Sequence, residues 1–401
     1  MSFTRSHDNW SPLYFLAALG SGGMIVTFFM YLMFWIPHPG QPIPVFEDWT
    51  GALATGSPLE QAGIAVAIAG IIFFMFYHLR LVAWNIAQYR LWKANGGLPA
   101  IIGKNAHTQL LAIPLTLAMT INAAFIAGAL FVPGLWSVVE YLFPFAMLGF
   151  GALGVWAIAM YLSFFSHVVS NKQFDNSANN SLAQLMPAFA FAMVGVGMAA
   201  PAAMSHNAVT VGASIFFAGL FIVPSLFVTV VKMIIGIGHM LDHGVTRSTL
   251  PTLWVGVPII TTLSIASLRI DHGLAHTLGL NENAGAPLLF LGTVIAAQLF
   301  LILLGGAVMK RMRYFKALLS GEEQTPVVYA LVCPGVAFSV SLQFFINKGL
   351  VAAGVLAKFG LAYWVFTGFA IVIQVITAVA LVMLVRQLIS ARDQASIPAT
   401  A

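Results

Sequence analysis

Residues 11–36 read SPLYFLAALGSGGMIVTFFMYLMFWI, a stretch that contains no charged side chain. A helix of about 20 apolar residues is long enough to cross the hydrocarbon core of a bilayer. Nine further stretches of this kind follow along the chain, at 62–86, 107–131, 139–166, 182–204, 209–236, 250–268, 285–309, 326–346 and 361–389. The sequence therefore predicts an all-α polytopic membrane protein with ten transmembrane helices.

The overall composition excludes a soluble protein. Of all residues, 60% are hydrophobic and 7% are charged, whereas about 25% are charged in an average globular domain. The formal net charge of +5 comes from basic residues beside span ends, where they meet anionic lipid headgroups. We therefore expect membrane lipid, and no nucleic acid, as a partner.

The basic residues also predict the orientation, because Lys and Arg near span ends resist translocation. If the N-terminus is cytoplasmic, 14 of the 17 lysines and arginines fall on the cytoplasmic side. Only Arg269, Lys348 and Lys358 then remain in outer gaps. We expect a multi-pass protein of the bacterial inner membrane with both termini in the cytoplasm.

Consecutive spans pair into five helical hairpins within one transmembrane domain, residues 1–401. The hairpins cover about 11–86, 107–166, 182–236, 250–309 and 326–389. The first helix of each hairpin carries a helix-weakening feature near one depth. These features are Gly20, Gly22 and Gly23 in the first hairpin, and then Pro114, Pro187, Pro258 and Pro334.

Two interpretations of this recurrence remain open. A proline kinks a helix and frees a carbonyl, which is tolerated in lipid only where protein or water satisfies that carbonyl. Five weakened odd-numbered helices are then expected to surround a central path, with the even-numbered helices outside. Alternatively, Pro and Gly simply allow membrane helices to pack closely.

Three stretches carry a resemblance to a known family. They are LPTLWVGVPIITTLSIASL from Leu250, VVYALVCPGVAFSVSLQFF from Val327 and NSLAQLMPAFAFAMVGVG from Asn180. Together with the ten spans, they make nearly the whole chain resemble the tellurite-resistance/dicarboxylate transporter (TDT) family, which includes the plant slow anion channels.

The resemblance implies a homotrimer in which each protomer holds its own pore, built by the five odd-numbered helices in a quasi-fivefold arrangement. It also implies small anions as cargo, and a phenylalanine before the ninth-span proline as a plug. Here that position is Cys333, before Pro334. Either the pore is wider here, or another aromatic side chain fills it, or Cys333 is an ordinary buried residue. The aromatic candidates are Phe189, Phe191 and Phe338.

Ionisable side chains are almost absent from the predicted spans, which disfavours a proton relay. With no buried cation, an anion would be held by backbone N–H groups, helix dipoles and hydroxyls. The polar candidates are Thr116, Thr120, Asn122, Thr261, Thr262, Ser264, Ser339 and Ser341. Each of them has an alternative role, a hydrogen bond back to its own helix.

Ten histidines raise the alternative of a haem-bearing electron-transfer subunit. Their expected positions at span ends or in loops, that of His78 included, argue against ligands that face one another in a bundle. The pair His239 and His243 lacks a third metal ligand, and the group Asp271, His272 and His276 is expected in an outer loop. We expect no cofactor, no metal site and, since no catalytic motif is present, no enzyme.

The function predicted from the sequence is an anion channel or channel-like transporter for small inorganic anions of the chloride and nitrate class. The alternative is a secondary transporter that exports sulfite or a C4-dicarboxylate. The haem-bearing subunit is the remote third possibility.

Overall fold

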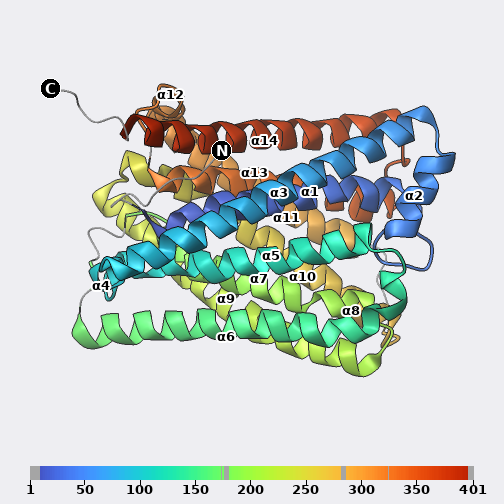
Figure 1. The fold of residues 1–401 in the computed structure, drawn as a ribbon, viewed down its shortest axis with the longest axis horizontal. Helices are drawn as coiled ribbons and strands as arrows, with labels where there is room; N and C mark the ends of the chain where they lie inside the picture. Colours follow the sequence, from blue (N-terminus) through green and yellow to red (C-terminus); the bar gives the residue numbers. More distant parts are fainter. Residues whose placement is uncertain (1–9, 173, 176–179, 281–285, 324, 396–401) are drawn as a thin grey trace.

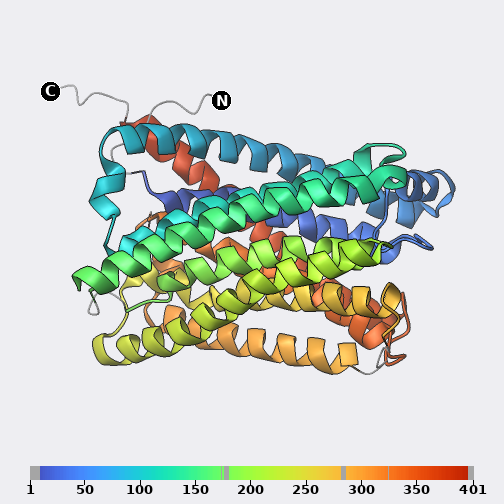
Figure 2. The same ribbon diagram turned by 90° about the horizontal axis from the view of Figure 1, so that it is seen from below.

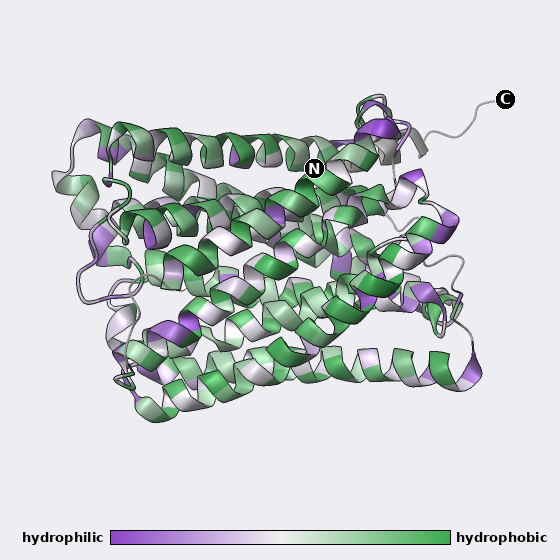
Figure 3. Ribbon diagram, turned by 180° about the vertical axis from the view of Figure 1, so that it is seen from behind, coloured by the Kyte–Doolittle hydropathy of each residue, from purple (hydrophilic) through white to green (hydrophobic). Residues whose placement is uncertain are grey.

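The computed structural model describes residues 10–172, 174–175, 180–280, 286–323 and 325–395 of the chain, and every regular element in these ranges is a helix. Ten helical spans run side by side along the long axis of the molecule (Figure 1). Apolar residues dominate their length, and polar residues gather mainly at the two ends (Figure 3). The all-α polytopic class and the ten predicted spans are therefore confirmed.

The odd-numbered spans contain the shorter α-helices, which are α1 (Phe15–Trp35), α5 (Ala112–Phe131), α7 (Met186–Met198) with α8 (Ala200–Met204), α10 (Gly256–His276) and α13 (Val332–Phe344). The even-numbered spans are longer: α3 (Pro58–Ala94), α6 (Val139–Asn171), α9 (Ala208–His243), α11 (Ala286–Arg311) and α14 (Leu361–Ala395). Three short helices connect spans: α2 (Phe46–Thr55), α4 (Gly97–Ile101) and α12 (Tyr314–Leu319).

Burial separates the spans into an inner and an outer set. Between 56% and 94% of the most apolar window is buried in each odd-numbered span, against 22% to 33% in each even-numbered span. A helix that is apolar all round and buried belongs to a core, and one with a large exposed apolar face is placed to contact lipid. The odd-numbered helices thus form the inside of the molecule, as the sequence predicts.

The inner helices contact one another in a closed circuit. Helix α1 contacts α5, α5 contacts α7, α7 contacts α10, α10 contacts α13, and α13 returns to α1. Each outer helix packs on the inner helix of its own hairpin, and the layering is visible from a second direction in Figure 2. The exact fivefold relation of the hairpins stays a prediction.

Each inner α-helix follows a short 3₁₀ segment, directly in four spans and after the single residue Val255 in the seventh. These segments are Pro12–Tyr14, Asn105–Leu111, Ala183–Leu185, Arg247–Trp254 and Pro326–Leu331. The four prolines singled out in the sequence occupy the second or third residue of the α-helix that follows, where a missing N–H costs no α-helical hydrogen bond. They therefore mark the change from 3₁₀ to α geometry, and do not kink the middle of a helix.

The three glycines of α1 allow its close contacts. A Cβ on Gly20 would lie 2.6 Å from Cγ1 of Val332, and one on Gly23 would lie 2.7 Å from Cγ1 of Val336, both on α13. A Cβ on Gly22 would lie 2.6 Å from Cγ of Met119 on α5. Small residues at such interfaces let membrane helices approach closely. These contacts support the packing interpretation for the glycines.

Buried polar side chains of outer helices bind the inner set. Gln298 of α11 donates to the hydroxyl oxygens of Thr261 at 2.6 Å and Ser341 at 3.0 Å, joining α10 to α13. His78 of α3 donates from Nδ1 to the Ala18 carbonyl oxygen at 2.7 Å, and its Nε2 lies 2.9 Å from Oγ1 of Thr120.

The placement of His78 at a span end was wrong, because this fully buried residue lies well inside α3. Since both its ring nitrogens are engaged with α1 and α5, it is a structural link between helices.

Candidate functional site: the centre of the inner ring

The inward face of α7 is identified by what covers its other faces. A Cβ on Gly195 would meet Ile222 of α9, and Val194 lies against Gly154 of α6. Residues spaced i, i+4 and i+7 share one helix face, and the remaining face carries Phe189, Met193 and Val196. This face is directed at the other inner helices.

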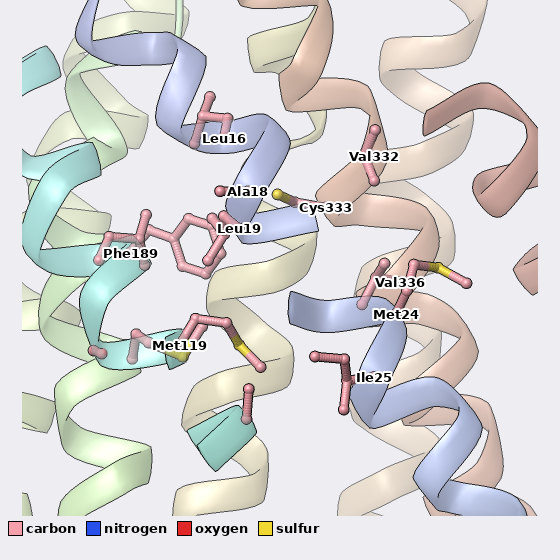
Figure 4. Close-up of a cluster of buried hydrophobic side chains, with 14 of the residues drawn as sticks. Leu16, Ala18, Leu19, Met24, Ile25, Met119, Phe189, Val332, Cys333 and Val336 are labelled. Carbon is pink, nitrogen blue, oxygen red and sulfur yellow. The ribbon is translucent and has the colours of Figure 1, made fainter. Parts of the chain in front are cut away.

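The same reasoning applies to α13. Val332 and Val336 lie against α1, a Cβ on Gly335 would meet Thr377 of α14, and Ser341 binds Thr261 of α10. Cys333 then falls on the inward face. Figure 4 shows the ring of Phe189 and the thiol of Cys333 directed toward Leu19 from different helices.

These central side chains leave no open passage at their level. Leu19, Phe189 and Cys333 are 3%, 3% and 7% exposed and belong to one continuous cluster of buried residues. The structure is closed here by apolar groups from α1, α7 and α13, and Met119 of α5 lies beside them (Figure 4).

The other two aromatic candidates lie elsewhere. Phe191 makes an edge-on contact with Tyr161 of the outer helix α6, at 5.8 Å between ring centroids. Phe338 belongs to a separate buried cluster with Val257, Ile295 and Ala370, which places it toward α11 and α14. The structure thus brings Phe189 and Cys333 together at the centre, without Phe191 and Phe338.

Most polar candidates on the inner helices are already engaged by backbone carbonyls. Asn122, Thr120, Thr262 and Ser264 donate to carbonyl oxygens of their own helices at 2.6 to 3.2 Å. Four others bind across helix boundaries: Thr116 to the Phe15 carbonyl, Ser339 to the Ala370 carbonyl, and Thr261 and Ser341 to each other. Only Asn122 combines a partly exposed side chain with the inward direction, since its Nδ2 lies 3.7 Å from Sδ of Met193.

The expectation of no cation within the spans was wrong. Helix α10 continues to His276, so Arg269 lies on an inner helix and not in an outer loop. Its Nη1 donates to the carbonyl oxygen of Val196 on α7 at 2.6 Å. The signal that would have found it is the spacing of Leu263, Ile270 and Leu274, which continues the apolar helical pattern past residue 268.

The group of Asp271, His272 and His276 was also assigned wrongly to a loop, because it lies on the last turns of α10. The rings of His272 and His276 stack at 5.5 Å between centroids, and His276 lies 5.3 Å from the ring of His206. Among the described residues, no group of three or more His, Cys, Asp or Glu is arranged to hold a metal ion.

At the opposite end, loops preceding two inner helices are held by ion pairs. Arg247, which begins the 3₁₀ segment before α10, lies 3.6 Å from Glu322 and 4.0 Å from Glu323, both in the loop before α13. Arg247 and Glu322 are exposed, so their pair contributes little stability, about 0 to 1 kcal/mol.

The fold and this site define a multi-pass membrane protein with an inner ring of helices, an architecture suited to a transporter or channel. A scan of family models finds none that matches the chain, and a search of curated proteins finds no significant match.

Proposed function

We propose that this protein is an anion channel or channel-like transporter of the TDT type, which passes small inorganic anions such as chloride or nitrate across a bacterial inner membrane. On this proposal it is a homotrimer with one path in each protomer and cytoplasmic termini. It catalyses no covalent step and needs no cofactor.

The observation that carries the proposal is the closed circuit of five buried helices around an apolar constriction at Phe189 and Cys333. A constriction of apolar side chains can gate ion flow by excluding water.

The charges within the spans favour anions and passive flux. In the described part of the ten spans, acidic residues occur only in or next to the end turns, as Glu60, Glu140, Asp242 and Asp271. A proton-coupled carrier usually relies on an intramembrane carboxylate or histidine relay. Arg269, a cation on the inner helix α10 beside the constricted path, attracts anions and repels cations.

The hydrogen bonds of His78 argue against the haem-bearing alternative. Both its ring nitrogens already have partners, so neither is free to ligate iron. The sulfite or dicarboxylate exporter remains the competing function on the same fold, and the two differ in kinetics.

Current across a planar bilayer containing the purified protein tests the proposal, with chloride or nitrate gradients and with sulfite and malate substituted in turn. Discrete anion-selective current is the expected result. Absence of current, together with saturable uptake into liposomes that depends on a second ion, would overturn the channel in favour of the exporter.

A further inference from the structure

A single guanidinium lies between two inner helices, toward the outer end of the predicted path. Arg269 is partly exposed, and its one hydrogen bond goes from Nη1 to the Val196 carbonyl oxygen. Among the described residues, no carboxylate lies within ion-pairing distance of it. An arginine in a membrane span without a counter-charge is expensive and marks a functional site by default.

The helix geometry directs Arg269 toward the path. On α10, Thr261 contacts α13 and a Cβ on Gly273 would meet Ala202 of α8. At 3.6 residues per turn these two positions lie about 120° apart, and Arg269 falls between them. The opposite side of the helix carries Gly256, whose Cβ would meet Leu301 of the outer helix α11.

The carbonyl that Arg269 binds belongs to the inward face of α7. Val196 follows Phe189 by two turns, which at 1.5 Å per residue places the guanidinium about 10 Å beyond the constriction. Asp271, the nearest acidic residue in sequence, projects about 160° away around α10. Among the described residues, no carboxylate therefore lies between Phe189 and the positive charge on this face.

The unused donors of Arg269 define the chemistry of its ligand. The bond to Val196 occupies Nη1, which leaves the edge formed by Nε–H and Nη2–H without an acceptor in the described part of the chain. This edge matches two oxygens of one oxyanion, whereas a lysine offers only a point charge.

We propose that Arg269 is an anion-binding site at the outer end of the path, and that it holds a small oxyanion such as nitrate through the Nε and Nη2 edge. This inference rests on the proposed function and names the substrate class that the path prefers.

Three variants test the site. Arg269→Gln removes the charge and retains a donor for Val196, while Arg269→Lys keeps the charge and loses the two-donor edge. Lys358→Gln is the matched control, because Lys358 is an exposed cation in the loop after α13. Bilayer current is measured against nitrate concentration for each variant, and the nitrate-to-chloride permeability ratio is taken from reversal potentials.

Loss of charge-assisted hydrogen bonds is expected to raise the half-saturating nitrate concentration of Arg269→Gln about tenfold or more. Arg269→Lys should conduct chloride but lose the preference for nitrate, and Lys358→Gln should match the wild type. If Arg269→Gln behaves like Lys358→Gln, the binding site is refuted while the channel stands.

A second measurement separates this site from the proposed function. If the wild type carries no anion at all, the proposed function fails, and nitrate-dependent thermal stabilisation of the detergent-solubilised protein then decides the site alone. Stabilisation of the wild type that is lost in Arg269→Gln supports the site. Equal stabilisation of both, or none in either, overturns it.

Discussion

Phe189 and Phe191 are buried phenylalanines of α7 whose rings point to opposite faces of the helix. Each can therefore serve as the control for the other. Replacing either ring by Ala in a core costs about 3 to 5 kcal/mol, so both variants should lose similar stability. Only Phe189→Ala removes a ring from the centre, and we expect it to raise basal anion current several-fold. Equal currents in both variants, measured in bilayers, would remove Phe189 from the gate.

Cys333 offers the reverse experiment, since its thiol points into the same centre (Figure 4). Cys333→Phe adds a ring between Leu19 and Phe189, and we expect it to lower basal current below that of the wild type. The purified variant is first checked for a single symmetric peak in size-exclusion chromatography. A well-folded variant with unchanged current would contradict the gate assignment.

The sequence does not predict the direction in which most side chains of the inner helices point. Cys333 was identified because it precedes a proline in a characteristic stretch. The contacts of its neighbours on α13 leave its side chain directed at the centre, and its role in a gate stays a prediction. Phe189, Phe191 and Phe338 could not be distinguished, because an inner helix is apolar on all faces and its pattern has no polar side. The partners that cover each face, such as Tyr161 for Phe191, come from distant parts of the chain.

At the scale of helices, the packing of α1 on α13 depends on glycine. A Cβ added at Gly20 meets Val332 at 2.6 Å, whereas one added at Gly368 of α14 meets nothing within 4 Å. Gly→Ala favours a helix by up to about 1 kcal/mol, but overpacking costs about 1 to 3 kcal/mol. Gly20→Ala should therefore lower the thermal midpoint in detergent, while Gly368→Ala should leave it equal or higher. A Gly20→Ala midpoint at or above the Gly368→Ala value would show that α1 and α13 have room to adjust.

The short helix α12 contains a testable buried phenol. Tyr314 is fully buried, and its hydroxyl has no hydrogen-bond partner among the residues that the structure describes. Burial, with a smaller contribution from Glu323, raises the pKa of Tyr314 above its usual 10.0. In the unfolded chain the phenol of Tyr314 loses its proton near pH 10, whereas in the folded protein it stays protonated to higher pH. The contribution of this group to the free energy of unfolding is therefore present below pH 10 and is lost as the pH rises above it.

Tyr314→Phe should therefore flatten the fall of the thermal midpoint above pH 10, and at neutral pH should be neutral or slightly stabilising. Thermal scans of both proteins across this pH range provide the measurement. An unchanged alkaline slope would mean that other groups control it.

The predicted end of the seventh span, at residue 268, explains why Arg269 was not recognised as a cation within a span. Hydropathy falls after residue 268 because Arg269, Asp271 and His272 are polar, and a window of apolar residues ends there. The helix continues to His276 because its other faces still pack on α8 and α9. Tertiary packing, which a single sequence does not reveal, thus extends the span and brings the cation inside.

At the scale of the whole molecule, the division into inner and outer helices was predicted and their pairing was not. Proline lies near the start of each later odd-numbered span, but Pro58 and Pro287 also lie at the start of the even-numbered helices α3 and α11. Burial, and not proline, therefore separates the two sets. The closed circuit from α1 through α5, α7 and α10 to α13 depends on contacts such as Gly20 with Val332, more than 300 residues apart. No local pattern specifies these contacts.

The orientation in the membrane is open to a direct test, because the chain has one cysteine. Helices α4 and α12 lie at one end of the molecule and α2 at the other (Figure 1). The α12 end carries Lys310, Arg311, Arg313 and Lys316, and basic residues remain cytoplasmic. In a Cys333→Ser background, Gly40→Cys should react with a membrane-impermeant maleimide in intact spheroplasts. Ser320→Cys should react only after the membrane is permeabilised, and the reverse pattern would place the basic end outside.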